Sequence, residues 1–151
     1  MKEPKITWYA RLDKEEEYTQ TDSIYAGSYT HDIDFLSVQM QIWNNRWGTK
    51  DVKALSNFNI YIYFENEEDY SLLQYCTVVL NDSDILSINK TNKIGVLTLP
   101  DNIEISGIAN DGTEDKNPNN FISLEFRFKT PKEIKLKEND LKSLYLEIMP
   151  L

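Results

Sequence analysis

Apolar and polar residues alternate along most of this chain, and this period of two constrains the fold more than any other feature. Successive side chains of a strand point to opposite sides of a sheet, so the alternation predicts half-buried β-strands. The clearest apolar sets are Leu36, Val38, Met40 and Ile42, then Phe58, Ile60, Ile62 and Phe64, and finally Ile122, Leu124, Phe126 and Phe128.

Turn-forming stretches separate the predicted strands: "NDSD" at 81–84, "PDN" at 100–102 and "NDGTEDKNPNN" at 110–120. We therefore expect an all-β fold, an antiparallel β-sandwich of seven to nine strands with immunoglobulin-like or jelly-roll topology. A closed barrel is the less favoured alternative. Two short helical turns are expected, one capped by Asn66 and one over 49–55. The segment 139–149 fits a helix or a strand, and its all-strand surroundings favour the strand.

The chain has 151 residues, of which 40% are hydrophobic. This length is typical of one domain, and we expect residues 1–151 to form a single β-sandwich. A chain of this size buries enough surface for a core without disulfides. The single cysteine, Cys76, allows no internal disulfide in any case.

The formal net charge of −9 argues against nucleic-acid partners and anionic membrane surfaces, which need clustered Lys and Arg. No apolar run reaches the length of a membrane span. The N-terminal segment "MKEPKITWYARLDKEEE" has no signal-peptide pattern, so we expect synthesis in the cytoplasm without a signal peptide.

Catalytic signatures are scarce. His31 is the only histidine, and nothing in the sequence joins it to Cys76 or to a nucleophile-elbow serine. No glycine-rich phosphate loop is present. We expect a protein that is not an enzyme and needs no cofactor.

One loop raises calcium as an alternative ligand. The stretch "NDGTEDKNPNN" carries oxygen ligands close in sequence, namely Asp111, Glu114, Asp115 and Asn117. Their spacing does not match an EF-hand loop. The favoured interpretation is a polar turn, in which Asp111-Gly112 supplies a positive φ and Asn117-Pro118 stops a strand.

The stretch "QIWNNRWGT" at 41–49 is the most unusual in the chain. Trp43 belongs to the odd-numbered set of its strand, so it leaves the sheet on the face opposite the core. If the next long strand is its neighbour in one sheet, Tyr61 and Tyr63 share that face. The candidate contact residues are then Trp43, Asn45, Arg46, Trp47, Tyr61 and Tyr63.

Three interpretations of Trp43 and Trp47 remain open. The long connection 44–56 could fold back and cover them. They could contact another protein, since exposed aromatics suit recognition. They could also stack on a carbohydrate or another small ligand. Cover by the chain itself is slightly favoured.

Two stretches carry a resemblance: "VQMQIWNNRWGTKDVKALSNFNIYIYF" and "ISGIANDGTEDKNPNNFISLEFRFKTP". The second resembles the late hairpin of cohesin-like and immunoglobulin-like bacterial modules. Ile, Asn, Lys and Tyr, which have AT-rich codons, make up 51 of the 151 residues. Together, residues 35–64 and 103–131 look like a small β-sandwich structural protein of a tailed bacteriophage virion, from the head, neck or tail.

This resemblance implies a non-enzymatic structural or interaction module. Its partners would be other protein subunits, either copies of itself or virion proteins, and its location the virion. The alternative is a carbohydrate-binding or adhesin-like module that uses its exposed aromatics.

Overall fold

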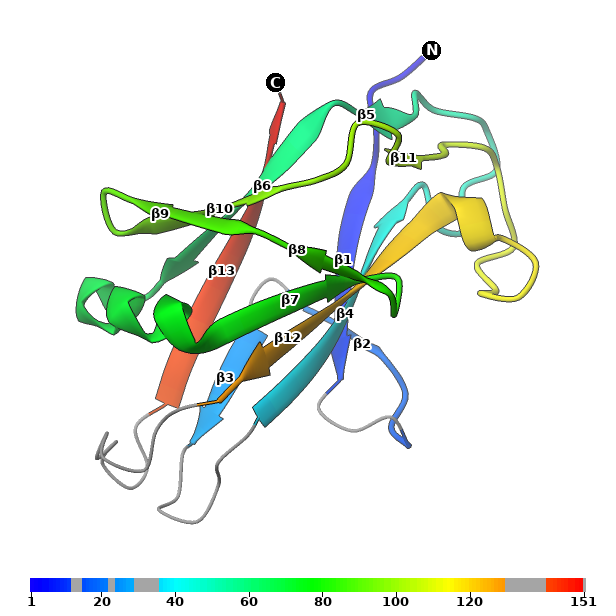
Figure 1. The fold of residues 1–151 in the computed structure, drawn as a ribbon. Coiled ribbons are helices and arrows are strands. Elements are labelled where there is room, and N and C mark those ends of the chain that lie inside the picture. Colours follow the sequence, from blue (N-terminus) through cyan, green and yellow to red (C-terminus); the bar gives the residue numbers. More distant parts are fainter. Residues whose placement is uncertain (12–14, 22–23, 29–35, 130–140, 151) are drawn as a thin grey trace.

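The computed structural model describes residues 1–11, 15–21, 24–28, 36–129 and 141–150. They form an antiparallel β-sandwich, which confirms the predicted fold class (Figure 1). Among the described residues, ten pairings join neighbouring strands, and all ten are antiparallel. The finer choice between immunoglobulin-like and jelly-roll topology stays a prediction, as does the single-domain boundary.

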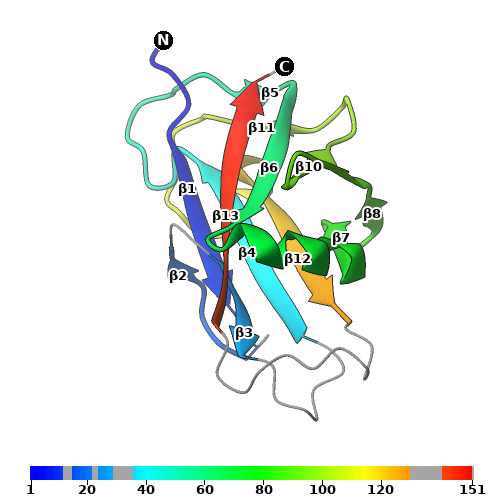
Figure 2. The same ribbon diagram turned by 90° about the vertical axis from the view of Figure 1, so that its left-hand side faces the viewer.

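Two sheets make the layers of the sandwich. In spatial order, the first sheet contains β2 (Thr19–Gln20), β1 (Ile6–Arg11), β4 (Leu36–Asn44), β12 (Phe121–Phe128), β7 (Cys76–Leu80) and β8 (Asp84–Leu86). The second sheet contains β3 (Ile24–Ser28), β13 (Leu141–Pro150), β6 (Phe58–Phe64), β10 (Ile94–Thr98) and β9 (Ile88–Thr91). A third, two-stranded sheet pairs β11 (Glu104–Ile105) with β5 (Leu55–Ser56), at the end of the sandwich where both chain termini lie (Figures 1 and 2).

The chain crosses from one sheet to the other at most of its connections. Only β1–β2, β7–β8 and β9–β10 are sequence neighbours within the same main sheet. Strands β4 and β6 therefore lie in different sheets. The condition under which Trp43, Tyr61 and Tyr63 would share one face is therefore not met.

The predicted inward-facing sets meet between the layers. Val38, Met40 and Ile42 from β4 are all buried in the core. Strand β6 alternates strictly between buried and half-buried residues, and β12 nearly so. Burial of apolar area at about 25 cal/mol per Å² makes these sets the main stabilising contribution.

Two 3₁₀ helices complete the described fold: η1 (Glu67–Tyr75) and η2 (Pro118–Asn120). The predicted cap is confirmed, because the Asn66 side chain accepts a hydrogen bond from the Glu68 backbone N–H at 3.1 Å. Helix η1 places Leu72 and Leu73 in the core.

Three local predictions need comment. Residues 49–55 are not helical, because the Val52 N–H donates to the distant Gly107 carbonyl and Val52 bridges Lys2. The C-terminal strand is confirmed as β13. The thirteen strands in the described residues exceed the expected seven to nine, partly because β2, β5 and β11 have only two residues each.

Candidate functional site

The chain turns sharply after β4, and two residues of this turn adopt the left-handed backbone conformation. Asn45 and Trp47 have φ angles of 60° and 61°. The Gly48 N–H donates to the Asn45 carbonyl at 2.9 Å and closes the turn. A Cβ at position 48 would overlap the Asn45 carboxamide, so only glycine fits there.

The two asparagines of this turn fasten it to other loops. The Asn44 side chain accepts a hydrogen bond from the Lys5 N–H at 2.9 Å and donates to the Lys53 carbonyl at 2.9 Å. The Asn45 amide donates to the carbonyls of Lys50 and Gly107 at 2.8 and 2.9 Å. Asn45 is buried, so its predicted role as a contact residue is wrong: its side chain is consumed in satisfying backbone carbonyls.

Trp43 is covered by its own chain. Its ring stacks on Phe121, its cross-strand partner on β12, with ring centroids 4.5 Å apart. The Arg46 guanidinium lies over the Trp43 ring at 4.3 Å, and the Trp43 Nε1–H donates to Gln41 Oε1 at 2.9 Å. With 0% of its surface exposed, Trp43 cannot contact a partner, so the contact role predicted for it is wrong.

Arg46 is the centre of an aromatic cluster rather than a free contact. Its guanidinium carbon lies 4.3 Å from the Trp47 ring and 4.5 Å from the Tyr9 ring, in addition to Trp43. Its Nε–H donates to the Gly112 carbonyl at 3.1 Å. Cation–π contacts on three rings hold this half-buried side chain in place, and its contact role stays a prediction.

Trp47, by contrast, is presented to solvent, with 57% of its surface exposed. Its backbone N–H donates to Asn110 Oδ1 at 3.1 Å, and its indole lies so close to Gly112 that a Cβ there would overlap it. Ile108, 60% exposed, is held through its carbonyl by the Asn110 amide at 3.0 Å. The Asn110 side chain thus joins the backbones of Trp47 and Ile108. We call these three residues the Trp47 ledge.

Tyr61 and Tyr63 belong to the outer face of the second sheet. Tyr63 stacks on Tyr145, its partner on β13, with centroids 5.4 Å apart. The Tyr63 hydroxyl donates to Glu147 Oε1 at 2.8 Å, and this hydrogen bond raises the pKa of Tyr63. Both tyrosines are half-buried, and they form a separate surface from Trp43 and Trp47.

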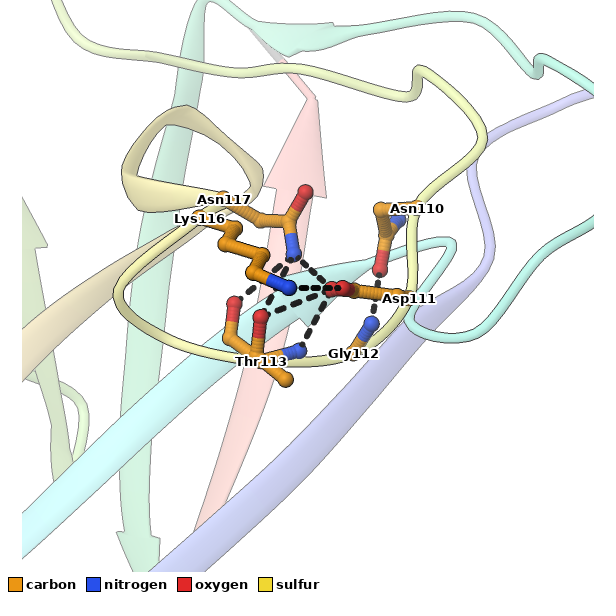
Figure 3. Close-up of polar contacts among 6 residues, drawn as sticks. All are labelled: Asn110, Asp111, Gly112, Thr113, Lys116 and Asn117. Carbon is orange, nitrogen blue, oxygen red and sulfur yellow. Dashed lines mark hydrogen bonds and ion pairs between the residues drawn. The ribbon is translucent and has the colours of Figure 1, made fainter.

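In the loop 110–117, Asp111 is held by hydrogen bonds from residues of the same loop (Figure 3). Asp111 Oδ1 accepts hydrogen bonds from the Thr113 hydroxyl at 2.7 Å, the Thr113 N–H at 3.1 Å and the Asn117 amide at 2.6 Å. These bonds, led by the Thr113 hydroxyl, lower the pKa of Asp111 to about 2. Lys116 Nζ lies 3.7 Å from the other Asp111 oxygen.

The four predicted calcium ligands are not assembled into one site. Glu114 points to the first sheet, where its carboxylate accepts a hydrogen bond from the Gln41 amide at 2.9 Å. Asn117 turns its amide nitrogen, not its oxygen, toward Asp111. Across the described part of the chain, no three His, Cys, Asp or Glu side chains gather as a metal site would require. The geometry supports the polar turn that the sequence favoured.

Comparisons with protein-family models, curated proteins and solved structures gave no match for this chain. The residues themselves are therefore the basis for any functional argument. Within the described ranges, no helix has the length and apolar character to span a bilayer. His31 and its neighbours Asp32 and Asp34 lie outside the described residues.

Several residues of the site escaped the sequence reasoning. Tyr9 and Phe121 complete the cluster around Arg46 and Trp43, and both stand out of phase with the apolar sets of their strands. Ile108 is a single exposed apolar residue in a loop, and the sequence held no signal for it because isolated apolar residues are common on protein surfaces. Cys76 packs against the core, and burial raises the pKa of its thiol to about 12.

Proposed function

We propose that this protein is a non-enzymatic interaction module that joins protein subunits through the Trp47 ledge. One observation carries the proposal: Trp47 is 57% exposed although both its backbone and its ring are held in place. An exposed tryptophan normally loses conformational freedom on binding. Here that freedom is already restricted by the turn, so association costs less entropy.

The composition of the ledge suits a protein partner. Tryptophan is among the residues that dominate binding energy in protein interfaces, and it acts best beside other apolar groups. Ile108 is a second exposed apolar residue, and Asn110 links its backbone to that of Trp47 through the Trp47 N–H and the Ile108 carbonyl. A partner would place an apolar pocket over the indole and hydrogen-bonding groups around it.

The absence of catalytic function is part of this proposal. The sole cysteine is held as a neutral thiol by burial, which disfavours nucleophilic chemistry at neutral pH. The proposed partners are other subunits, either copies of this chain or proteins of a phage virion. The virion location is supported by the resemblance of residues 35–64 and 103–131 and by the composition.

Analytical ultracentrifugation across the micromolar range tests the proposal. The wild type is compared with Trp47→Ser and Ile108→Ser, and with Ile85→Ser as a matched control. Ile85 is also exposed, at 74%, but lies on the edge strand β8. The same variants are co-expressed with the products of neighbouring genes and analysed for complex formation.

We expect the wild type to associate with itself or with a neighbouring gene product. Both ledge variants should weaken that complex by roughly tenfold or more, as expected for an interface anchor, while Ile85→Ser leaves it unchanged. A wild type that stays monomeric and forms no complex in either assay contradicts the proposal. A complex that survives both ledge variants contradicts it as well.

The carbohydrate alternative cannot use the aromatic platform that the sequence predicted. Trp43 is buried, and Tyr61 and Tyr63 lie on the other sheet. Any such site has to be sought elsewhere on the molecule.

A further inference from the structure

A groove of about 390 Å³ crosses the outer face of the first sheet. Its floor is made by outward-pointing residues of the two central strands, Gln39 and Gln41 from β4 and Ser123 and Glu125 from β12. Small-molecule sites are usually mostly apolar with a few polar groups. This groove is rich in amides and carboxylates instead, so its occupant must be strongly polar.

The strand register sets the spacing of the floor. Gln39 lies directly opposite Glu125 on one side and Arg11 on the other. Gln41 lies opposite Ser123 in the next outward-facing row. Neighbouring strands in a sheet are about 4.8 Å apart. The hydrogen-bonding side chains on neighbouring strands of the floor therefore have a spacing comparable to the width of a pyranose ring.

Gln39 is the residue that points to a ligand. Only 8% of its surface is exposed, and its Oε1 accepts a hydrogen bond from the Arg11 Nε–H at 2.7 Å. Its amide nitrogen donates no hydrogen bond to any of the residues that the structure describes. The nitrogen is not among the enclosed side-chain atoms that lack a partner, so it is open to the groove, where water or a ligand can accept its hydrogen bond.

Gln41 provides the internal contrast. Its amide donates to Glu114 and its oxygen accepts from the Trp43 indole, both at 2.9 Å. The two glutamines lie on the same strand and the same face, two residues apart. One is satisfied by the protein, and the other keeps a donor for the groove.

The rim adds an aromatic surface and a charge preference. The Arg11 guanidinium lies 4.2 Å from the centre of the Tyr18 ring, which fixes this ring at the groove. Burial raises the pKa of the Tyr18 hydroxyl, so the hydroxyl stays neutral. Glu125 is paired with Arg127, but the other two lining carboxylates, Asp82 and Glu114, still outnumber the Arg11 guanidinium, which disfavours anionic ligands.

We propose that this groove binds a neutral, hydroxyl-rich ligand, namely a short oligosaccharide. Sugar hydroxyls both donate and accept hydrogen bonds, so they can pair with the Gln39 amide, with Ser123 and with the planar carboxylates. The face of the Tyr18 ring that Arg11 does not cover offers a surface for the apolar face of a sugar ring. This site is separate from the Trp47 ledge and does not depend on the proposed function.

Nuclear magnetic resonance of the ¹⁵N-labelled protein tests the site directly. The probes are maltotetraose, cellotetraose, xylotetraose and chitotetraose as neutral ligands. Tetragalacturonate and the tetramer of glucosamine serve as anionic and cationic counterparts. We expect at least one neutral tetramer to shift the Gln39 side-chain NH₂ signals and the Ser123 amide signal, and the tetragalacturonate to shift neither.

Two variants and one control complete the design. Gln39→Leu removes the free donor, and Ser123→Val fills the floor with a residue that strands tolerate well. Each should weaken binding about tenfold, the effect of a lost hydrogen bond to a ligand. Thr98→Val is the matched change on the exposed face of β10 in the other sheet and should leave binding unchanged.

Four outcomes overturn the proposal: no neutral tetramer shifts the Gln39 signals; only the glucosamine tetramer does so; shifts gather at Trp47 or at Tyr61 and Tyr63; or Ser123→Val, with its melting temperature retained, binds as well as the wild type.

Discussion

The two outer faces of the sandwich both carry aromatic residues, but the chain covers its own aromatic residue only around Trp43. On the first sheet, Trp43 is stacked between Phe121 and Arg46 and is fully buried. On the second sheet, Tyr63 stacks on Tyr145 yet both stay half-buried. An aromatic residue on the outward phase of a strand is therefore not in itself a binding patch.

The connections explain the difference. After β4, the chain makes a left-handed turn and returns Arg46 over the face that it has just left. The loop 106–117 then reaches the same place, where the Gly112 carbonyl accepts a hydrogen bond from Arg46. Trp43 is closed over by this arrangement, while Trp47 at its outer edge remains exposed. Of these two tryptophans, only four residues apart, Trp43 is therefore a buried structural residue and Trp47 is exposed to solvent.

The largest expected effect comes from removing the buried tryptophan. Trp43→Ala should lower the free energy of unfolding by about 3–5 kcal/mol, because it deletes a fully buried ring and leaves a cavity. Tyr63→Ala on the open face should cost about 1 kcal/mol. Urea denaturation of both variants measures the difference, and equal losses would mean that the two faces are not distinct.

The next effect concerns the fastening of the turn. Asn45→Ala should cost roughly 2–4 kcal/mol, since it removes two hydrogen bonds to backbone carbonyls and strains a left-handed residue. Asn45→Gly tolerates the positive φ but still loses both hydrogen bonds, so it should be destabilised less. Thermal unfolding ranks the three proteins, and a glycine variant as stable as the wild type would show that the side-chain bonds contribute nothing.

A smaller effect is expected at the centre of the aromatic cluster. Arg46→Lys keeps the charge but loses the planar group that lies over three rings, and should cost about 1–2 kcal/mol. Arg127→Lys is the matched control, because Arg127 pairs with Glu125 on the same face and is about half exposed. Arg127→Lys should lower the free energy of unfolding by no more than about 1 kcal/mol. Equal losses in urea denaturation would contradict the special role of Arg46.

The smallest expected effect concerns the titration of the Asp111 carboxyl in the loop 110–117. Hydrogen bonds from Thr113 and Asn117 lower the pKa of Asp111 to about 2 from its ordinary value of 3.8. The carboxylate form is thus favoured in the folded state, so its contribution to stability is present above the ordinary pKa and is lost as pH falls toward 2. Carboxyl chemical shifts measure this pKa. Asn117→Ala should move it upward, and an Asp111 that titrates near 3.8 in the wild type would show that the turn does not form.

Much of the local structure could be predicted from the sequence. Alternation identified the inward faces of β4, β6 and β12, since face selection depends on a local period of two. The Asn66 cap and the polar turn at 110–117 were likewise predicted, because each rests on side-chain-to-backbone bonds a few residues apart.

The assignment of strands to sheets, and the residues that cover Trp43, could not be predicted in this way. Whether β4 pairs with β6 or with β12 is decided by long-range packing, and no local pattern records it. Residues 49–55 have helix-forming residues, yet Val52 is held in an extended segment by Gly107, which is distant in sequence. For the site, strand phase predicted that Trp43 leaves the core, but not which residues would cover it.

Fluorescence quenching by acrylamide tests the central claim most directly, that Trp43 is closed off and Trp47 is presented. Trp8→Phe/Trp47→Phe leaves Trp43 as the only tryptophan, and Trp8→Phe/Trp43→Phe leaves Trp47. Folding of both proteins is confirmed first by circular dichroism. We expect the quenching constant of Trp47 to exceed that of Trp43 several-fold, as for an exposed against a buried indole. Equal constants, or stronger quenching of Trp43, would contradict the account.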